Sequence, residues 1–159
     1  MRNTNDDARA LVLMVGGPGA GKSTVRATRY ATLAVVDCDA IKAEHPDYNP
    51  ANPVTTHEWS SVQASRRLYA ALASGTSVVF DSTGTNVDKL ARMARSAQDA
   101  GFQVEVCYVR CPLAVALTRN ASRDRVVPEY VVREKHAAAA DAAARLSEIA
   151  DRYVVIENG

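Results

Sequence analysis

Residues 11–24 read LVLMVGGPGAGKST, and this stretch decides how the chain folds. Its apolar start predicts a buried strand, its glycine-rich part predicts a tight turn, and Lys22 stands where a helix begins. Gly16, four further residues and the sequence Gly-Lys-Ser form the Walker A pattern, in the strand, turn and helix context that the pattern requires. The stretch therefore predicts a nucleotide-binding fold.

The glycine-rich turn is expected to form a phosphate cradle, because glycines allow successive backbone N–H groups to surround an anion. The N-terminus of the following helix favours the same negative charge. Lys22 is expected to reach the terminal phosphates of ATP, with GTP left open, and Ser23 to coordinate Mg²⁺. The residues predicted to bind the nucleotide are Gly17, Pro18, Gly19, Ala20, Gly21, Lys22, Ser23 and Thr24.

Length and composition narrow the class of protein. A chain of 159 residues that is 47% hydrophobic fits one domain with a substantial core. A net charge of +1 is too small for a long nucleic-acid footprint, so any nucleic acid that binds is expected to be short. The cysteines lack CxxC spacing, which argues against a disulfide framework or a zinc site. We find no signal region and no apolar run of ~18 residues that could span a membrane. We therefore expect a cytoplasmic protein that does not associate with a membrane, and we expect no obligate protein partner.

Strands and helices are expected to alternate along the chain. β-Branched and apolar runs predict strands at residues 11–15, 34–37, 77–81, 103–109 and 153–156. Helices are expected at about 21–30, 55–75, 87–101, from 112 onward, and at 128–150. This order predicts an α/β fold of the P-loop NTPase type, a three-layer sandwich whose five-stranded parallel sheet has helices on both faces. Residues 1–10 are expected to form a flexible tail.

Three carboxylates follow predicted strand ends, where ligands of open α/β sheets bind. Asp37 ends the second strand, Asp39 comes two residues later, and Asp81 ends the third strand. Each has a structural alternative: Asp37 or Asp39 could cap a helix, and Asp81 could cap its loop, as could Asn86. The functional interpretation of Asp81 is that it holds a magnesium-bound water.

The segment before the third strand is expected to combine a loop with a long helix. Residues 44–56 contain three prolines, which predicts an irregular loop of the kind that often carries function. Thr55 and Glu58 match a capping box, and His57 and Ser60 are candidate substrate contacts. The predicted apolar stripe of the helix consists of Trp59, Val62, Tyr69 and Leu72.

Arginines gather between residues 110 and 135, where basic residues exceed acidic ones by three. Arg119, Arg123 and Arg125 lie in TRNASRDRVVP, where a helix is expected to break before Pro128 opens the next one. This pattern is typical of a short lid over phosphates, at about 118–128. The alternative is a solvated basic face.

Five stretches together resemble the zeta-toxin and polynucleotide-kinase group of P-loop kinases: GGPGAGKST, VVDCDAIKAEHPDY, THEWSS, VVFDSTGTN and RNASRDRVVP. The resemblance covers nearly the whole chain and implies that the cradle strand is central in the sheet. It implies that Asp39 accepts the proton of the acceptor hydroxyl, that Arg119 and Arg123 hold the transferring phosphate, and that THEWSS lines the acceptor pocket. Lys42 would be a nearby contact.

The resemblance and the motif together predict an ATP-dependent kinase that phosphorylates a hydroxyl of a nucleotide, a nucleotide-derived molecule or a short nucleic acid. One alternative is a UDP-sugar kinase of the zeta-toxin type, and another, of a different class, is a nucleotide-dependent switch or ATP-binding module. The predicted metal ligands are Ser23 and Asp39. The predicted substrate contacts are Asp37, Lys42, His57, Ser60, Asp81, Thr83 and Arg125.

Overall fold

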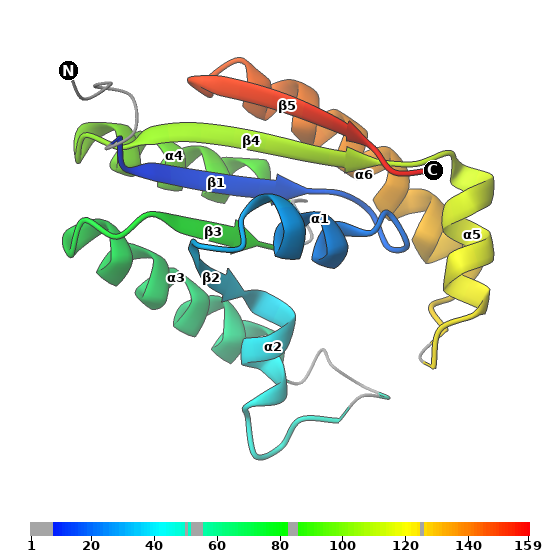
Figure 1. Cartoon of the computed structure of the whole chain (residues 1–159). Helices are drawn as coiled ribbons and strands as arrows, with labels where there is room; N and C mark the ends of the chain where they lie inside the picture. The colour runs from blue at the N-terminus through cyan, green and yellow to red at the C-terminus, as the bar shows by residue number, and fades with distance from the viewer. Residues whose placement is uncertain (1–7, 50, 52–55, 83–85, 125) are drawn as a thin grey trace.

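The computed structural model describes residues 8–49, 51, 56–82, 86–124 and 126–159 (Figure 1). Its strands are β1 (Ala10–Val15), β2 (Ala34–Asp37), β3 (Val78–Asp81), β4 (Gln103–Arg110) and β5 (Arg152–Glu157). Its helices are α1 (Lys22–Arg29), α2 (Cys38–Ala43), α3 (His57–Ala73), α4 (Val87–Asp99), α5 (Leu113–Ala121) and α6 (Glu129–Ser147). The predicted alternation of strands and helices is therefore confirmed.

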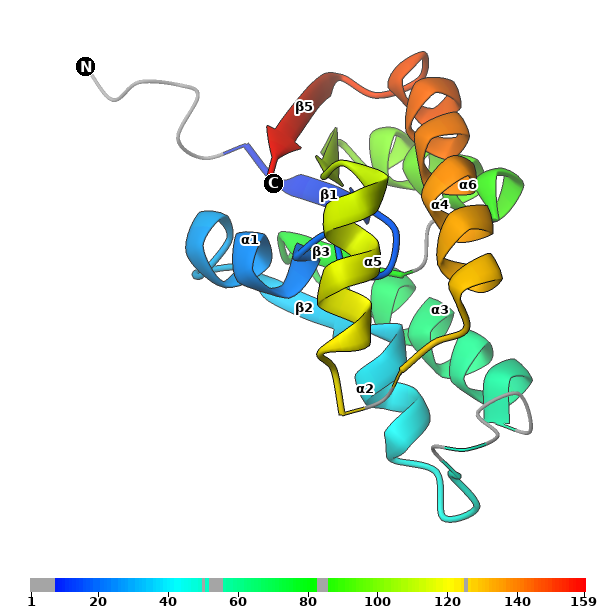
Figure 2. The same cartoon turned by 90° about the vertical axis from the view of Figure 1, so that its right-hand side faces the viewer.

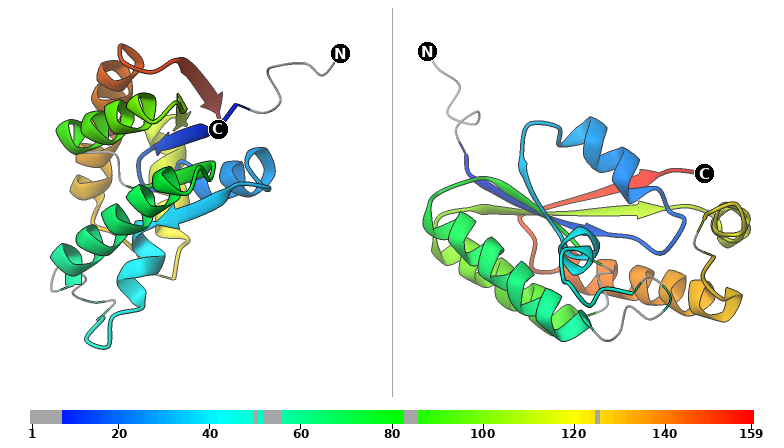
Figure 3. Two further views of the ribbon diagram at one scale, coloured as in Figure 1. Left: turned by 90° about the vertical axis from the view of Figure 1, so that its left-hand side faces the viewer. Right: turned by 90° about the horizontal axis from the view of Figure 1, so that it is seen from below.

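All five strands are parallel and stand in the order β2-β3-β1-β4-β5, so that the strand before the glycine-rich turn is central. Helix α1 covers one face of the sheet, while α3, α4 and α6 cover the other (Figure 3). Helix α5 stands beyond the end of β4 (Figure 2). The result is the predicted three-layer α/β sandwich.

The central strand β1 packs on both faces, which explains its unbroken apolar sequence. Leu11, Leu13 and Val15 belong to the core on the side of α3, α4 and α6. Val12 and Met14 belong to a second core together with residues of α1 and α5. Because β1 is fixed from both sides, the turn that follows it leaves the sheet at a rigidly defined point.

The predicted tail of residues 1–10 includes residues that belong to the sheet. Ala10 is the first residue of β1, and its N–H donates to Ser77 Oγ at 3.1 Å. The Arg9 carbonyl accepts a hydrogen bond from the N–H of Gln103 at 2.8 Å. Pairing with β4 therefore extends the ordered sheet into the stretch that was expected to be a tail, while residues 1–7 lie outside the described residues.

Helix α3 buries only part of the predicted apolar stripe: Leu72 is buried and Trp59 is half-buried against the core. Its buried residues are Ser60, Ala64, Leu68 and Leu72, spaced four apart. Val62 and Tyr69 are 46% and 42% exposed, so their assignment to the core is wrong. Ser60 and Ala64 are small side chains, which allow the helix backbone to lie close to the sheet.

The start of α3 also differs in detail from the prediction. Thr56 occupies the N-cap position, Glu58 lies in the first turn, and Thr55 lies outside the described residues. Trp59 is half-buried against the core, and its ring meets that of His45 edge-on at 4.8 Å. Among the described helices, none combines the length and the apolar character needed to cross a membrane.

Candidate functional site

The glycine-rich turn has the backbone that a phosphate cradle needs. Gly19 and Gly21 have φ angles of +79° and +89°, which only glycine adopts without strain. A Cβ atom at Gly21 would lie 2.0 Å from the side-chain nitrogen of Asn158, so the space also requires glycine. Gly21 is the N-cap of α1, whose first turn presents Ser23 and Thr24 to solvent. The free N–H groups of that turn are thus available to an anion.

Two side chains brace the cradle from outside by donating to its carbonyl groups. Arg119, on α5, donates from Nη1 to the Gly19 carbonyl at 3.0 Å and from Nη2 to the Asn158 carbonyl at 2.6 Å. Asn158 in turn donates from Nδ2 to the Ala20 carbonyl at 2.7 Å. Arg119 therefore lies beside the glycine-rich turn, where its guanidinium binds backbone carbonyl groups.

We expect Arg119→Ala to weaken binding of a fluorescent ATP analogue by about tenfold, because the Gly19 and Asn158 carbonyls lose a charged donor. Fluorescence titration measures this dissociation constant, and Arg123→Ala is the matched control that should leave it unchanged. Normal nucleotide affinity with lost turnover would place Arg119 on the transferring phosphate instead.

The predicted lid is a short connection closed by one buried side chain. Helix α5 ends at Ala121 and α6 begins after Pro128, which is its N-cap. Asn120 is 4% exposed; its Nδ2 donates to the Val127 carbonyl at 2.6 Å, and its Oδ1 accepts from the Val127 N–H at 3.0 Å. Between these fixed ends Arg123 is exposed, and Arg125 lies outside the described residues.

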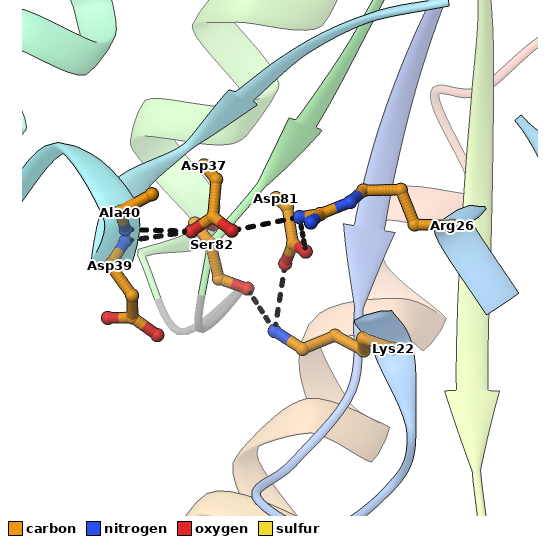
Figure 4. A network of polar contacts seen from close by, with 7 residues as sticks. All are labelled: Lys22, Arg26, Asp37, Asp39, Ala40, Asp81 and Ser82. Carbon is orange, nitrogen blue, oxygen red and sulfur yellow. Dashed lines mark hydrogen bonds and ion pairs between the residues drawn. The ribbon is translucent and has the colours of Figure 1, made fainter. Parts of the chain in front are cut away.

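The strand-end carboxylates Asp37 and Asp81 stand side by side, because they are register partners on β2 and β3. Asp37 Oδ1 accepts hydrogen bonds from the N–H groups of Asp39 at 3.0 Å and Ala40 at 3.1 Å. Asp37 is therefore the N-cap of α2, and the capping alternative for Asp39 is wrong. Asp39 lies in the first turn of α2 with its side chain exposed (Figure 4).

Lys22 and Arg26 project from α1 towards these carboxylates (Figure 4). Lys22 Nζ donates to the Ser82 carbonyl at 2.7 Å and lies 3.2 Å from Asp81 Oδ1. Arg26 Nη1 lies 2.9 Å from Asp37 Oδ2 and 2.7 Å from Asp81 Oδ2. Burial acts to lower the pKa of Arg26, but its hydrogen bond to Asp37 and the charges of both carboxylates outweigh burial and raise it.

Arg26 is a site residue that our sequence analysis misses. Its one signal is its position four residues after Lys22, which places both side chains on the same face of α1. Asn86, by contrast, has the capping role that the sequence offers as an alternative, since its Oδ1 accepts from the Lys89 N–H at 3.1 Å.

A cavity of about 130 Å³ opens beside the carboxylates, and it brings together the predicted base Asp39 and three of the predicted substrate contacts. Asp39, Lys42, His57 and Ser60 all line it. Lys42 Nζ lies 3.3 Å from His57 Nδ1, and the Ser60 hydroxyl donates to the His57 carbonyl at 2.8 Å. Thr83 lies outside the described residues. The other lining residues are Cys38, Ser61, Phe80, Ser82, Asn86, Lys89 and Leu90.

The cavity carries a positive charge at neutral pH. Burial, followed by the charges of Lys42 and Lys89, lowers the pKa of His57, so its ring is neutral. Burial raises the pKa of Cys38 to about 11, which keeps the thiol uncharged. The remaining charges are those of two lysines and Asp39, which leaves an excess of one positive charge in favour of an anionic ligand.

The donor groups for a magnesium ion are few. Within the described part of the chain, no group of three or more His, Cys, Asp or Glu side chains could hold a metal. Magnesium in kinases is bound mainly by substrate phosphates and water, with one or two protein oxygens. The exposed Ser23 hydroxyl at the start of α1 fits that arrangement.

We compared the sequence with profiles of known protein families and the fold with solved structures. The sequence profile of the Zeta toxin family matches residues 1–159, while no curated protein matches the chain. The PezAT chromosomal toxin–antitoxin system of the human pathogen Streptococcus pneumoniae shares the fold, with a TM-score of 0.75 at 16% identity. That match covers 95% of this chain and 69% of the other.

Two further structures share the fold at similarly low identity. A candidate kinase from Chloroflexus aurantiacus J-10-fl has a TM-score of 0.64 at 16% identity, over 94% of this chain and 88% of its own. AvrRxo1-ORF1:AvrRxo1-ORF2 with ATP has a TM-score of 0.61 at 18% identity, over 89% of this chain and 49% of its own. The chain thus spans about half the length of that protein. Likeness at these identities confirms the predicted fold.

The neighbours also correct one prediction. The sequence predicts no obligate protein partner, whereas the Streptococcus neighbour is a toxin–antitoxin system and AvrRxo1-ORF1 is found in a complex with AvrRxo1-ORF2. The prediction is wrong because a partner surface of this kind leaves no sequence pattern comparable to the Walker motif. Exposed apolar residues do occur in the connection between α5 and α6 and at the start of α6, where Val126 and Tyr130 are 59% and 66% exposed.

Proposed function

The chain belongs to the zeta toxin family, and we propose that it is an ATP-dependent kinase that phosphorylates a hydroxyl of a nucleotide, a nucleotide-derived molecule or a short nucleic acid. The observation that carries this proposal is that the Walker lysine and the lined cavity meet at Ser82. Lys22 Nζ binds the Ser82 carbonyl, and Ser82 is also a cavity residue. A phosphate donor in the cradle would therefore face an acceptor in the cavity.

Each side chain has a definite task in such a transfer. Lys22 supplies positive charge to the β- and γ-phosphates, and Asp39 orients the acceptor hydroxyl and takes its proton. The hydroxyl oxygen forms the new bond to the γ-phosphorus as the bond to the β-phosphate oxygen breaks, which releases ADP. Arg123, on the lid connection, is our candidate for a charge that steadies the moving phosphoryl group.

Ser23 is the proposed ligand of Mg²⁺, together with the nucleotide's own phosphates. When bound, the ion neutralises charge on these phosphates. Asp39 is a second candidate ligand, because it lies in the same region of the sheet edge as Lys22 (Figure 4). A base and a metal ligand at this position predict different effects of Asp39→Asn on magnesium-ATP affinity.

The charge of the cavity supports an acceptor that is itself an anion. Lys42 and Lys89 both line it, and Lys89 Nζ donates to the Ser61 hydroxyl at 2.6 Å. Nucleotides, nucleotide sugars and the ends of short nucleic acids all offer phosphate groups to such lysines. A UDP-sugar kinase of the zeta-toxin type would catalyse the same phosphoryl transfer, with a UDP-sugar as the acceptor.

A panel of acceptors tests the proposal. Purified protein is incubated with γ-labelled ATP, Mg²⁺ and, in separate reactions, nucleosides, UDP-sugars, NAD or 5′-hydroxyl oligonucleotides. We expect label to pass to a phosphate-bearing acceptor and not to the uncharged nucleosides. Binding of ATP without transfer to any member would contradict the kinase proposal and favour the nucleotide-dependent switch or ATP-binding module.

A protein antitoxin is the partner that the neighbours support for this chain. If such a partner restrains the proposed kinase, expression of the chain alone in bacteria should arrest growth, and Lys22→Ala should relieve the arrest. Growth curves with matched expression levels measure both effects. Normal growth of cells that contain active wild-type kinase would argue against the need for a neutralising partner.

A further inference from the structure

Arg26 joins the helix of the phosphate cradle to the two neighbouring strand ends (Figure 4). It lies on α1 one turn after Lys22, and its Nη1 contacts Asp37 at 2.9 Å and Asp81 at 2.7 Å. Because the two aspartates are register partners on adjacent parallel strands, about 4.8 Å separates their backbones. Two carboxylates at that spacing repel each other unless a cation lies between them.

The charges of this cluster balance. Asp81 is 8% exposed and contacts both Lys22 and Arg26, whereas Asp37 contacts Arg26. Two carboxylates thus meet two cations from one helix. When Lys22 engages a nucleotide phosphate, Arg26 remains as the counter-charge of Asp81, which a buried carboxylate requires.

Asp37 connects Arg26 to the start of α2. Its Oδ2 faces Arg26, so its Oδ1 is directed at the N–H groups of Asp39 and Ala40. Helix α2 has six residues, and helices of that length are marginal without a cap and tertiary contacts. The side-chain orientation of Asp37 therefore controls where the first turn of α2 lies, and with it the position of Asp39.

We propose that Arg26 is a positioning residue that holds Asp39 in place relative to the phosphate cradle, through the capping carboxylate of Asp37. The inference rests on the proposed function, in which Asp39 acts on the acceptor hydroxyl. In this proposal a single helix, α1, positions groups that act on the phosphate donor and on the acceptor. Lys22 fixes the phosphate donor, and Arg26 fixes the group that prepares the acceptor.

The test compares Arg26→Ala, Arg26→Lys, Asp37→Asn and the double variant Arg26→Ala/Asp37→Asn with wild type. Arg145→Ala is the matched control, since Arg145 forms an exposed ion pair with Asp141 on α6, at 3.8 Å. Three quantities are measured: amide exchange of Asp39 and Ala40 by NMR, affinity for a fluorescent ATP analogue, and kcat and KM for the acceptor that wild type phosphorylates in the panel.

We expect Arg26→Ala to speed exchange of the Asp39 and Ala40 amides and to lower kcat by about 10- to 100-fold, the usual cost of a misplaced reacting group. Affinity for the ATP analogue should fall as well, because Lys22 then has to serve both Asp81 and the nucleotide phosphates, and kcat is therefore compared at saturating nucleotide. Arg26→Lys should recover part of kcat, since lysine keeps the positive charge but lacks the planar guanidinium group. The double variant should be no worse than the more impaired single variant, because both changes break one link.

One result would overturn the proposal. Unchanged amide exchange in Arg26→Ala would do so whatever happens to turnover. If nucleotide affinity falls while the amides stay protected, the role of Arg26 is to neutralise Asp81 and leave Lys22 available to the nucleotide. If wild type phosphorylates no member of the panel, the proposed function fails, and amide exchange alone then decides whether Arg26 positions α2.

Discussion

Replacing Lys22 with alanine is expected to abolish measurable phosphoryl transfer, with a loss of at least about 10²- to 10³-fold, the scale seen when one preorganised charge-stabilising donor is removed. Lys22 Nζ reaches both the Ser82 carbonyl and Asp81 Oδ1, at the point where the cradle meets the cavity. The measurement is label transfer from γ-labelled ATP under conditions that saturate the wild type.

The same substitution should leave the fold intact. Asp81 keeps its ion pair with Arg26 at 2.7 Å, so no buried carboxylate is left without a counter-charge. The melting temperature of Lys22→Ala should therefore lie close to that of wild type, and Lys22→Met, which keeps much of the aliphatic stem, should behave alike. Wild-type activity in either variant would refute the kinase proposal.

Asp39→Asn is expected to lower turnover by about 10²- to 10⁴-fold, the usual contribution of general acid–base catalysis. The substitution separates chemistry from structure, because Asp37 and not Asp39 caps α2. Melting temperature and affinity for magnesium-ATP should change little. Steady-state kinetics, thermal unfolding and nucleotide titration measure the three quantities.

Asp88→Asn is the matched control for this variant, since Asp88 is an exposed acidic residue in the first turn of α4. It should have wild-type turnover. If binding of magnesium-ATP collapses together with turnover in Asp39→Asn, Asp39 is a metal ligand, and Asp37 becomes the first candidate for the base. If turnover persists, Asp39 has no catalytic task.

The sequence predicts the strands closely because their signal is local. The apolar run after Ala10 and the β-branched run at residues 34–37 give β1 and β2 nearly to the residue. The sequence analysis also singles out the cavity-lining residues Asp39, Lys42, His57 and Ser60, and the family resemblance points to all four. Strand order then brings their segments together at one edge of the sheet.

The contacts that the sequence cannot predict join side chains distant along the chain. Arg26 meets Asp81 across 55 positions, and no periodicity marks such a pair. The apolar pattern of α3 misleads for a related reason, because Val62 and Tyr69 are large and apolar while Ser60 and Ala64 are the residues that fit against the sheet. Packing depends on the shape of the facing surface, which hydrophobicity alone does not describe.

The brace on the cradle has a consequence for biosynthesis. Asn158 reaches the Ala20 carbonyl across 138 positions of the chain, and Arg119 reaches the Gly19 carbonyl across 100. A ribosome makes the Walker segment before Asn158, so the bond from Asn158 cannot form until that residue has been added and has left the exit tunnel. Nucleotide affinity in stalled nascent chains of increasing length should therefore rise late, when the last strand docks beside the turn that began the fold.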